Sequence, residues 1–321
     1  MRSFVHIGIL VCSVAWTVTT NAAFAKLSSE KSSARTPVQR TDYDGLPDAR
    51  KTADSNYVTD LPAEFDARQH FVKCSDVIGD IKDQGNCASS WAVAVASSFT
   101  DRLCIKTDGK FTKHLSAQNL MSCGAERSTG CGGGSAFKAW EHTMTKGIVT
   151  GGHYGSNEGC QPYQRSTCDH FGVTGGKNCS SEILMVQTTC DEKCSNENYG
   201  IDYNEDLHKT SSVYMTSWTN VKQIQQEIAT YGPVTAFMYV YENFLSYKRG
   251  VYKSTAGRMV GYQYVKLIGW GVDEVDGEYW LAMNSWNNSW GECGFFKILR
   301  GYNLCSIELL VMAGTVQDVS R

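Results

Sequence analysis

The cysteines constrain this chain more than any other feature of its sequence. All 13 but one, Cys12, lie between Cys74 and Cys305, so an even number remains in that region. An even set of cysteines in an exported chain predicts a disulfide framework. A zinc site is the alternative, but only Cys190 and Cys194 have metal-like spacing, and no second pair completes it. The sequence therefore predicts disulfides, without fixing their pairing, and neither a metal nor another cofactor.

The first 25 residues have the pattern of a secretory signal peptide. Arg2 precedes an apolar run from Phe4 to Val18, and the small-x-small sequence Ala23-Phe24-Ala25 follows it. A membrane anchor would need about 20 uninterrupted apolar residues, which this run lacks, and we expect no membrane span elsewhere. The interpretation is a soluble protein that is secreted or lies in an endolysosomal or vacuolar compartment.

Composition separates a short polar segment from a large globular region. The chain has 321 residues, 42% of them hydrophobic, and a formal net charge of -3. It can bury one large core or two smaller ones, and its charge gives no reason to expect a nucleic-acid partner. Residues 26–60 are rich in Ser, Thr, Asp and Lys and poor in large apolar residues. We expect them to be a short propeptide-like or disordered segment.

Helical patterns come first in the globular region and strand patterns follow. Trp91, Val95, Phe99 and Leu103 recur at four-residue spacing, which predicts a helix packed inside a domain. Further helices are predicted at about 115–121, 136–144 and 220–230. Strands, rich in β-branched and aromatic residues, are predicted at 235–241, 265–271, 279–284 and 294–299. The order indicates an α+β fold.

The segment that leads into the first long helix carries the strongest motif. Residues 84–92 read Gln-Gly-Asn-Cys-Ala-Ser-Ser-Trp-Ala, which resembles the papain-family segment Gln-Gly-x-Cys-Gly-Ser-Cys-Trp-Ala. In that family the second cysteine is the nucleophile, and the glutamine side chain lines the oxyanion hole. The resemblance places Gln84 at the oxyanion position and Ser90 at the nucleophile position. A serine hydroxyl is much less acidic than a thiol and needs a general base to take its proton.

The same resemblance locates the position of that base. The family's histidine lies in Gly-Gly-His-Ala, on a strand that continues into Gly-Trp-Gly. Counting back from Gly269-Trp270-Gly271 without a gap places Gln263 there, and a glutamine amide cannot accept a proton at any useful pH. Asn284 matches the residue that orients the histidine, and Trp286 matches a tryptophan that shields it. Among the other histidines only His170 is expected near the cleft, on the wrong side for the proton relay.

From Leu61 to Ile307 the chain is similar to the cathepsin B branch in particular. This resemblance implies a papain-like two-lobed fold within residues 61–321, which we expect to be a monomer. A helical left lobe is expected at about 73–207, and an antiparallel β-barrel right lobe at about 208–310. An occluding-loop-like region is expected at 160–194.

The resemblance, and not the spacing, also supplies a disulfide pairing. The implied pairs are Cys74 with Cys104, Cys87 with Cys131, Cys123 with Cys190, Cys160 with Cys194, and Cys168 with Cys179. Cys293 and Cys305 remain. Either they bond to each other or one of them is a buried thiol.

Several residues fall where the resemblance implies substrate-binding positions: Gly133, Gly134, Trp286, Leu310, His170 and Phe171. The glycines allow a peptide backbone to approach closely, although a simple turn is the alternative. Leu310 replaces a pocket glutamate at the floor of the pocket for the second unprimed residue. Phe171 replaces a histidine that grips a substrate's C-terminal carboxylate, while His170 is placed to latch its loop onto Asp83.

Two further features bear on binding and processing. Tyr262 and Tyr264 replace a glycine and an alanine beside the base position, so we expect them to narrow the primed side of the cleft. Asn178 and Asn287 begin glycosylation sequons, which predicts a glycoprotein.

Loss of nucleophile and base together leaves only positioning and the oxyanion hole. We therefore expect a cathepsin B-like pseudopeptidase that binds peptides, cystatin-type inhibitors or other secreted proteins without hydrolysis. The alternative is an active or weakly active peptidase that uses Ser90 with an unorthodox base. A structural or matrix protein that uses surfaces away from the cleft is a third possibility.

Overall fold

The computed structural model describes residues 57–124, 130–171, 175–179, 189–216 and 219–317. The expected signal peptide and almost all of the 26–60 segment lie outside these residues. Within the described ranges, no helix combines the length and the apolar character needed to cross a membrane.

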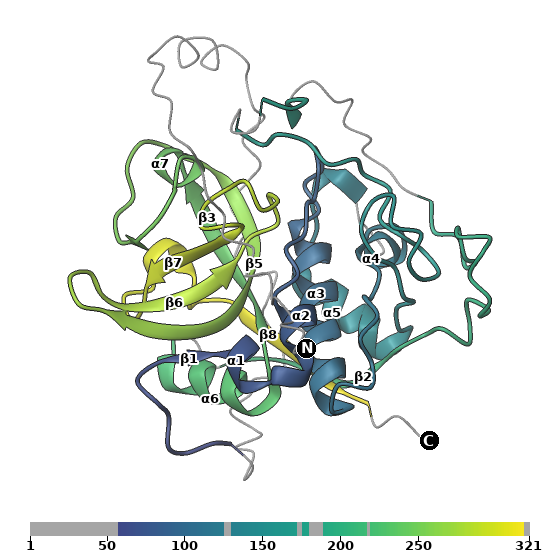
Figure 1. The fold of residues 1–321 in the computed structure, drawn as a ribbon, viewed down its shortest axis with the longest axis horizontal. Helices are drawn as coiled ribbons and strands as arrows, with labels where there is room; N and C mark the ends of the chain where they lie inside the picture. The colour runs from purple at the N-terminus through teal and green to yellow at the C-terminus, as the bar shows by residue number, and fades with distance from the viewer. Residues whose placement is uncertain (1–56, 125–129, 172–174, 180–188, 217–218, 318–321) are drawn as a thin grey trace, which may run out of the picture. The chain divides into compact units, whose positions relative to one another are not determined.

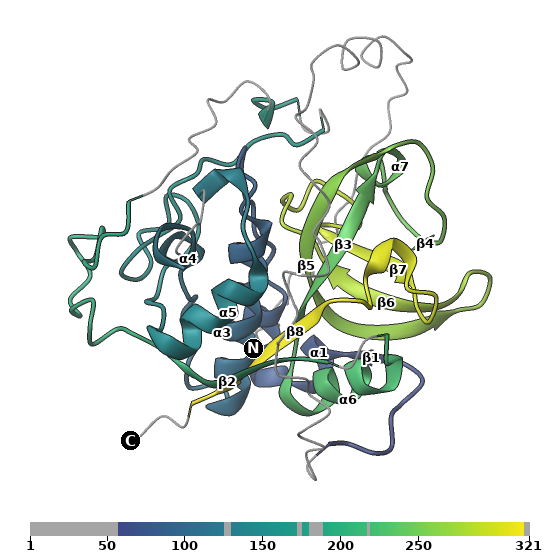
Figure 2. The ribbon, with the colours of Figure 1, turned by 180° about the vertical axis from the view of Figure 1, so that it is seen from behind.

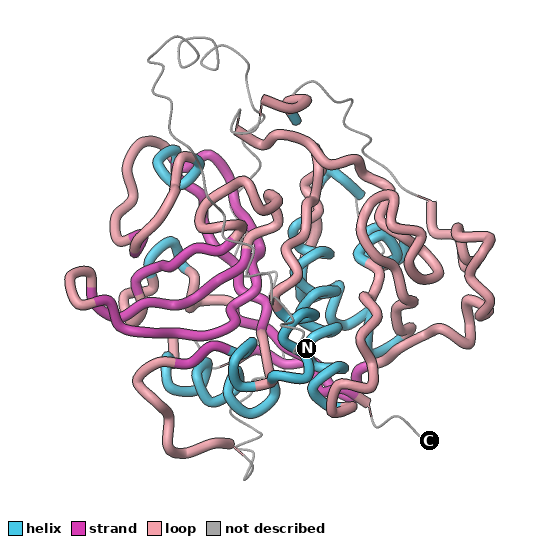
Figure 3. The backbone as a smooth tube through the Cα atoms, viewed as in Figure 1, coloured by secondary structure: helices cyan, strands magenta, loops and turns pink. Residues whose placement is uncertain are grey.

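Helices dominate the first half of the described chain, around the central helix α3 (Figures 1 and 3). Helix α3 (Ser90–Lys106) is buried from Ser90 to Cys104. The neighbouring helices are α1 (Ala67–His70), α2 (Ser75–Ile78), α4 (Ala117–Cys123) and α5 (Ala136–Thr145), with 3-10 turns η3 (Val72–Cys74) and η4 (Gly130–Gly132). Ser116 and Ser135 accept backbone N–H bonds at the starts of α4 and α5, as helix caps do. The three helices predicted in this half are confirmed.

A mixed eight-stranded sheet forms most of the second half. Its strands are β1 (Phe65–Asp66), β2 (Thr210–Met215), β3 (Val234–Tyr241), β4 (Val251–Tyr252), β5 (Met259–Asp273), β6 (Gly277–Met283), β7 (Phe295–Leu299) and β8 (Val311–Val316). They pair in the order β2-β8-β3-β5-β6-β7-β4, with β1 beside β5. Among the strands of the described residues, only β4 and β7 pair in parallel. Helices α6 (Val221–Tyr231) and α7 (Glu242–Leu245) and the 3-10 turn η6 (Leu304–Ser306) complete this half.

The predicted helix at 220–230 and the four predicted strands are present, and β5 is longer than its pattern indicated. It begins at Met259 rather than 265, so Gln263 lies on the strand, opposite Met238 of β3.

Two large hydrophobic clusters cross the expected boundary between the lobes. One packs α6 and the segment 65–78 against β3, β5, β6 and β7. The other packs α3, α4 and α5 against β2, β8 and residues of β3 and β5. Figure 2 shows β8 and β2 beside α3 and α5. The helical part therefore completes its core with strands from the end of the chain, and neither part could fold as a separate piece of sequence.

Five disulfides join the cysteine pairs that the family resemblance implied. They are Cys74–Cys104, Cys87–Cys131, Cys123–Cys190, Cys160–Cys194 and Cys168–Cys179. Cys293 and Cys305 are not bonded to each other. Cys305 is a buried thiol, and burial raises its pKa to about 12, which leaves it protonated and unreactive at ordinary pH.

A buried ion pair joins α3 to the second half of the chain. Arg102 of α3 lies 2.8 Å from the carboxylate of Glu227 on α6, and both side chains are almost fully buried. The hydroxyls of Tyr57 and Tyr214 donate to the same carboxylate at 2.7 and 2.6 Å. The guanidinium also donates to three backbone carbonyls: Gly232, Pro233 and Gly314. Each charge is thus compensated and hydrogen-bonded, which is the condition under which burial is tolerated.

A second charged cluster surrounds His114 at the edge of the helical half. Its Nε2 lies 3.1 Å from Asp80, and its Nδ1 lies 3.1 Å from Glu158. His153 and Lys82 also pair with Asp80. Burial alone would lower the pKa of His114, but the hydrogen bonds to Asp80 and Glu158 outweigh it and raise the pKa. Because both ring nitrogens face carboxylates, the cluster favours the imidazolium form.

We predict that Glu227→Gln lowers the free energy of unfolding by about 3–5 kcal/mol, because it leaves the Arg102 charge buried without a counter-ion. Urea unfolding of the purified protein measures this loss. The matched control is Glu141→Gln, since Glu141 and its partner Lys138 form an exposed pair on α5. The control should cost no more than about 1 kcal/mol. Equal effects from the two substitutions would contradict the structural role of the buried pair.

We predict that the contribution of His114 to stability is lost as the pH rises. Its pKa is raised in the folded state, so the stabilisation is complete below the unfolded value of about 6.5 and disappears above the folded pKa. His114→Gln should therefore cost about 1–2 kcal/mol at pH 5 and less at pH 8.5. His142→Gln is the control, because burial and Lys146 lower the pKa of His142. Urea unfolding against pH should show opposite slopes for these two variants relative to wild type.

Candidate functional site

The four residues predicted to form the reactive centre come together at the junction of α3 and the sheet. Gln84 lies in the loop before α3, and Ser90 is the first residue of α3. Gln263 lies on β5, and Asn284 directly follows β6. The Gln84 N–H donates to the Ser285 carbonyl at 2.9 Å, which fixes the loop against the sheet. All four side chains are at most 7% exposed, so they form a closed polar cluster rather than an open surface.

The Gln263 amide donates where an imidazole N–H was expected to donate. Its Nε2 lies 2.9 Å from Asn284 Oδ1 and 2.8 Å from Gln84 Oε1. Ser285 Oγ lies 3.2 Å away and is a third, longer acceptor. The glutamine therefore satisfies the orienting asparagine as a donor. Its remaining group is an amide oxygen, which accepts hydrogen bonds but does not take up a proton near neutral pH.

The Gln84 amide is held by groups of the protein itself. Its Nε2 donates to the Cys87 carbonyl at 2.7 Å. Its Oε1 accepts from Gln263 and, at 2.7 Å, from the Ser285 hydroxyl. One N–H proton of this amide is thus already engaged. The sequence reasoning missed Ser285, although its position directly after Asn284 was a signal that could have suggested it.

Ser90 is buried and lacks a basic partner in the described ranges. Its Oγ accepts from the Tyr264 backbone N–H at 3.2 Å, and no hydrogen bond in these ranges joins it to Gln263. The N-terminus of α3 favours an anion at this point, but a hydroxyl is too weakly acidic to ionise for that reason alone. The arrangement can position a carbonyl group, and it supplies no group that would activate Ser90.

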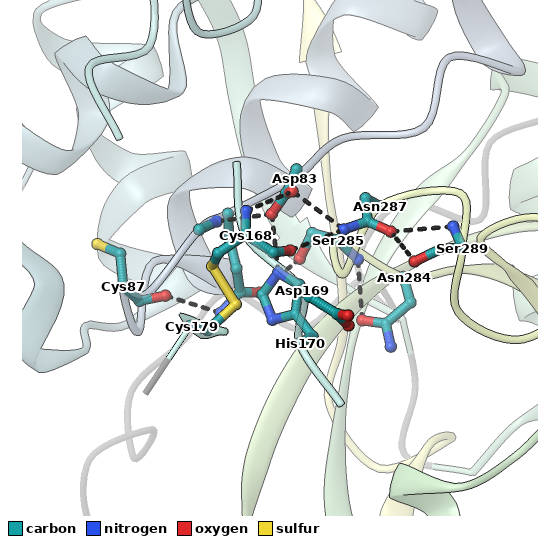
Figure 4. Close-up of polar contacts among 12 residues, drawn as sticks. Asp83, Cys87, Cys168, Asp169, His170, Cys179, Asn284, Ser285, Asn287 and Ser289 are labelled. Carbon is teal, nitrogen blue, oxygen red and sulfur yellow. Dashed lines mark hydrogen bonds and ion pairs between the residues drawn. A yellow bond between two sulfur atoms is a disulfide. The ribbon is translucent and has the colours of Figure 1, made fainter. Parts of the chain in front are cut away.

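Asp83 anchors the loop around residue 170 to the same centre (Figure 4). Its carboxylate lies 2.7 Å from His170 Nε2 and accepts from Gly85 N at 2.8 Å. Asn287 Nδ2 and Cys168 N donate to it at 3.1 and 3.3 Å. Burial opposes ionisation of Asp83, but the hydrogen bonds, that of His170 foremost, outweigh it and lower its pKa. The latch expected between His170 and Asp83 is therefore formed.

Asn287 is engaged in the structure and poorly placed for a glycan. Its Nδ2 donates both to Asp83 and to the Cys168 carbonyl, at 3.1 and 3.0 Å. A glycan on this nitrogen would displace these contacts. The second sequon extends into residue 180, outside the described residues.

Phe171 and Trp286 form an aromatic contact beside the latch. Their ring centroids are 5.0 Å apart with an edge-to-face geometry, and the His170 ring lies 6.3 Å from Trp286. Phe171 is 38% exposed, so the rim of the site presents an aromatic edge. Phe171 carries no positive charge with which the C-terminal carboxylate of a peptide could pair.

The structure gives a second reason for glycine at positions 133 and 134, besides the predicted close approach of a peptide backbone. A Cβ on Gly134 would lie 2.4 Å from the Trp91 ring, so the indole excludes any side chain there. Gly133 has φ +105°, a conformation that side chains disfavour. Both glycines are partly exposed, which leaves their predicted contact with a peptide untested.

Tyr262 and Tyr264 pack in the same hydrophobic cluster as Leu310. Successive strand residues alternate between faces, so both tyrosines lie on the face of β5 opposite Gln263. Their rings are 5.8 and 5.6 Å from Phe237, and Leu310 belongs to the same cluster. Tyr264 is only 2% exposed and Leu310 is 5% exposed. The expectation that Tyr264 narrows the primed side is wrong, because its ring is a core side chain.

Comparisons with known proteins agree with this geometry. The family model described as papain family cysteine protease matches residues 61–315. The cathepsin B-like cysteine proteinase 4 of Caenorhabditis elegans is 40% identical over 255 residues, which cover 79% of this chain and 75% of that protein. The cathepsin B-like cysteine proteinase of Schistosoma japonicum is 40% identical over 260 residues, covering 80% and 74%.

Solved structures show the same relationship. The proCathepsin B S9 from Trypanosoma congolense has a TM-score of 0.72 at 32% identity, and the match covers 87% of this chain and 85% of that one. Bromelain from Ananas comosus, at 21% identity and a TM-score of 0.57, shares the fold. The chain therefore belongs to the papain family of cysteine proteases.

Proposed function

We propose that this protein is a cathepsin B-like pseudopeptidase, which binds peptides or protein partners in a papain-type site without hydrolysing them. The observation that carries the proposal is the contact of Gln263 Nε2 with Asn284 Oδ1 at 2.9 Å. An amide N–H at this position keeps the hydrogen bond to the orienting asparagine. An amide does not, however, accept the proton that an imidazole would take up. Ser90, in the predicted nucleophile position, then has no base to activate it.

The retained architecture favours binding as the remaining task. The α3 N-terminus, the Gln84 amide and the glycines at 133 and 134 are the parts that position a peptide in the predicted site. The latch between His170 and Asp83 keeps a loop beside it, and Phe171 offers an aromatic edge. Secreted or endolysosomal proteins, cystatin-type inhibitors among them, are the proposed partners. Binding an inhibitor would make the protein a decoy for active relatives.

Proteolysis is the second candidate, because relatives about 40% identical are named as proteinases. It requires a base other than Gln263. Among the described histidines, His170 contacts Asp83 and Trp286, and His114 and His153 pair with Asp80. Because these imidazoles are engaged elsewhere, none of the three is placed to accept a proton from Ser90.

We predict that Ser90→Cys combined with Gln263→His produces hydrolysis of a short fluorogenic peptide. A thiol beside an imidazole forms an ion pair that attacks carbonyls without a separate base. The rate should exceed that of either single variant by about 100-fold or more. The pH profile of alkylation reports the pair directly, because only the double variant should react rapidly at acidic pH. A folded double variant without a low-pH thiolate would show that Gln263 is not the base position.

We predict that the purified wild-type protein gives no peptide turnover and still binds a cystatin-type inhibitor. Binding is measured by calorimetry, and turnover with the same fluorogenic peptide after removal of contaminating proteases. Ser90→Ala is the control, since any residual rate that it leaves unchanged does not come from Ser90. Turnover that Ser90→Ala abolishes would overturn the pseudopeptidase proposal and establish a serine nucleophile. If the protein showed neither turnover nor binding, its function would have to depend on a surface other than this site.

A further inference from the structure

The Cys168–Cys179 disulfide lies beside an imidazole, in the arrangement of a metal-binding group. One ligand atom each of Cys168, His170 and Cys179 lies within 4.8 Å of the other two. Figure 4 shows the disulfide next to the His170 ring, and a dashed line joins Asp83 to the ring. Cys168 and Cys179 are buried, and His170 is largely buried. Two sulfurs and an imidazole are the ligand types that zinc prefers.

The sulfurs are bonded to each other in the structure, so they are not thiolate ligands in this state. A small dithiol would reduce the bond by exchange: its two S–H groups supply two electrons and two protons and become a disulfide, and Cys168 and Cys179 become thiols. Zinc ligation then requires loss of both thiol protons, which are released to solvent.

The backbone holds the two cysteines close without the disulfide. Asp169 and Asn178 form a backbone bridge. The Cys179 N–H donates to the Asp169 carbonyl at 3.1 Å, and the Asp169 N–H donates to the Lys177 carbonyl at 2.8 Å. The Asp169 side chain accepts from Phe171 N and Gly175 N, which ties the loop together. These contacts do not depend on the sulfurs, so reduction leaves the two cysteines facing each other.

The geometry needs little adjustment. The two Cα atoms are 4.9 Å apart, and the bonded sulfurs of any disulfide are about 2.0 Å apart. Two thiolates on a tetrahedral zinc, each at about 2.3 Å, are separated by about 3.8 Å. The sulfurs must therefore move apart by less than about 2 Å, a distance that side-chain rotation can supply.

Asp83 completes the environment of the imidazole. Its contact with His170 at 2.7 Å is the carboxylate–histidine pair that orients metal-ligating imidazoles through their second nitrogen. The same carboxylate accepts from the Cys168 N–H. The imidazole and the orienting carboxylate are therefore already in contact, and the carboxylate also holds the backbone of Cys168.

We propose that reduction of the Cys168–Cys179 disulfide converts this cluster into a zinc site formed by both thiolates and His170, with water as the fourth ligand. The metal replaces the disulfide as the clamp of the loop, so the loop stays closed in a reducing compartment. The site is independent of Ser90 and Gln263, and it stands whether or not the protein hydrolyses peptides.

The test uses the full mature protein, treated with a dithiol and freed from it, and then titrated with Co²⁺ and Zn²⁺. Alkylation and mass mapping verify which cysteines are reduced, and circular dichroism verifies the fold. We expect one equivalent of Co²⁺ with thiolate-to-metal charge-transfer absorption, displaced by Zn²⁺, only after reduction. Asp83→Asn should weaken metal binding by about 10–100-fold, which a purely structural carboxylate would not do.

The matched control is the double variant Cys168→Ser and Cys179→Ser, which retains the other disulfides and both remaining thiols. It should show no charge-transfer band after the same treatment. Metal binding that is equal in this variant, or equal before and after reduction, would overturn the proposal. Persistence of the Cys168–Cys179 bond under a dithiol that leaves the protein folded would overturn it as well.

Discussion

The contacts of α3 across the molecule are the constraint on which the rest of the structure depends. Arg102 reaches α6, β8 and the turn before β3 through one guanidinium, and the adjacent Asp101 pairs with Lys266 of β5 at 2.7 Å. These charges have partners only when the helical half and the sheet are assembled. Ser90 lies at one end of this helix and Gln263 lies on β5. The geometry of the site therefore depends on buried ion pairs that lie three to four helical turns along α3 from Ser90.

At the position that the family resemblance implies for the base, a glutamine amide makes the hydrogen bonds but does not take up a proton near neutral pH. A glutamine side chain fits beside Asn284 and Gln84 and donates to the side-chain oxygen of each. The cluster is buried, and Asn284 Nδ2 has no hydrogen-bond partner among the described residues. Stability and reactivity make different demands on the same position, since packing needs a donor of suitable size and hydrolysis needs a group that exchanges a proton.

Helical spacing and strand composition located most elements because they are local signals, whereas the family resemblance located the four central side chains. The family resemblance supplied the disulfide pairing, which spacing could not. Local patterns missed β2 and β8, whose hydrophobic residues are buried only by partners distant in sequence. They also misplaced Tyr264, since the face on which a strand residue lies depends on the register of the whole sheet. Ser285 and Asn287 act through contacts across more than 100 residues, which no local pattern contains.

Because of its position in the chain, Asp83 links the loop around His170 to the amide of Gln84. It holds the loop through His170 and immediately precedes Gln84, whose side chain belongs to the amide cluster. A ligand that lifts the loop must disturb the backbone that positions Gln84, and a ligand that orders Gln84 must favour the closed loop. Linkage makes these two effects equal in free energy. We therefore expect displacement of the loop around His170 and displacement of the Gln84 amide to be coupled through the adjacent residues Asp83 and Gln84.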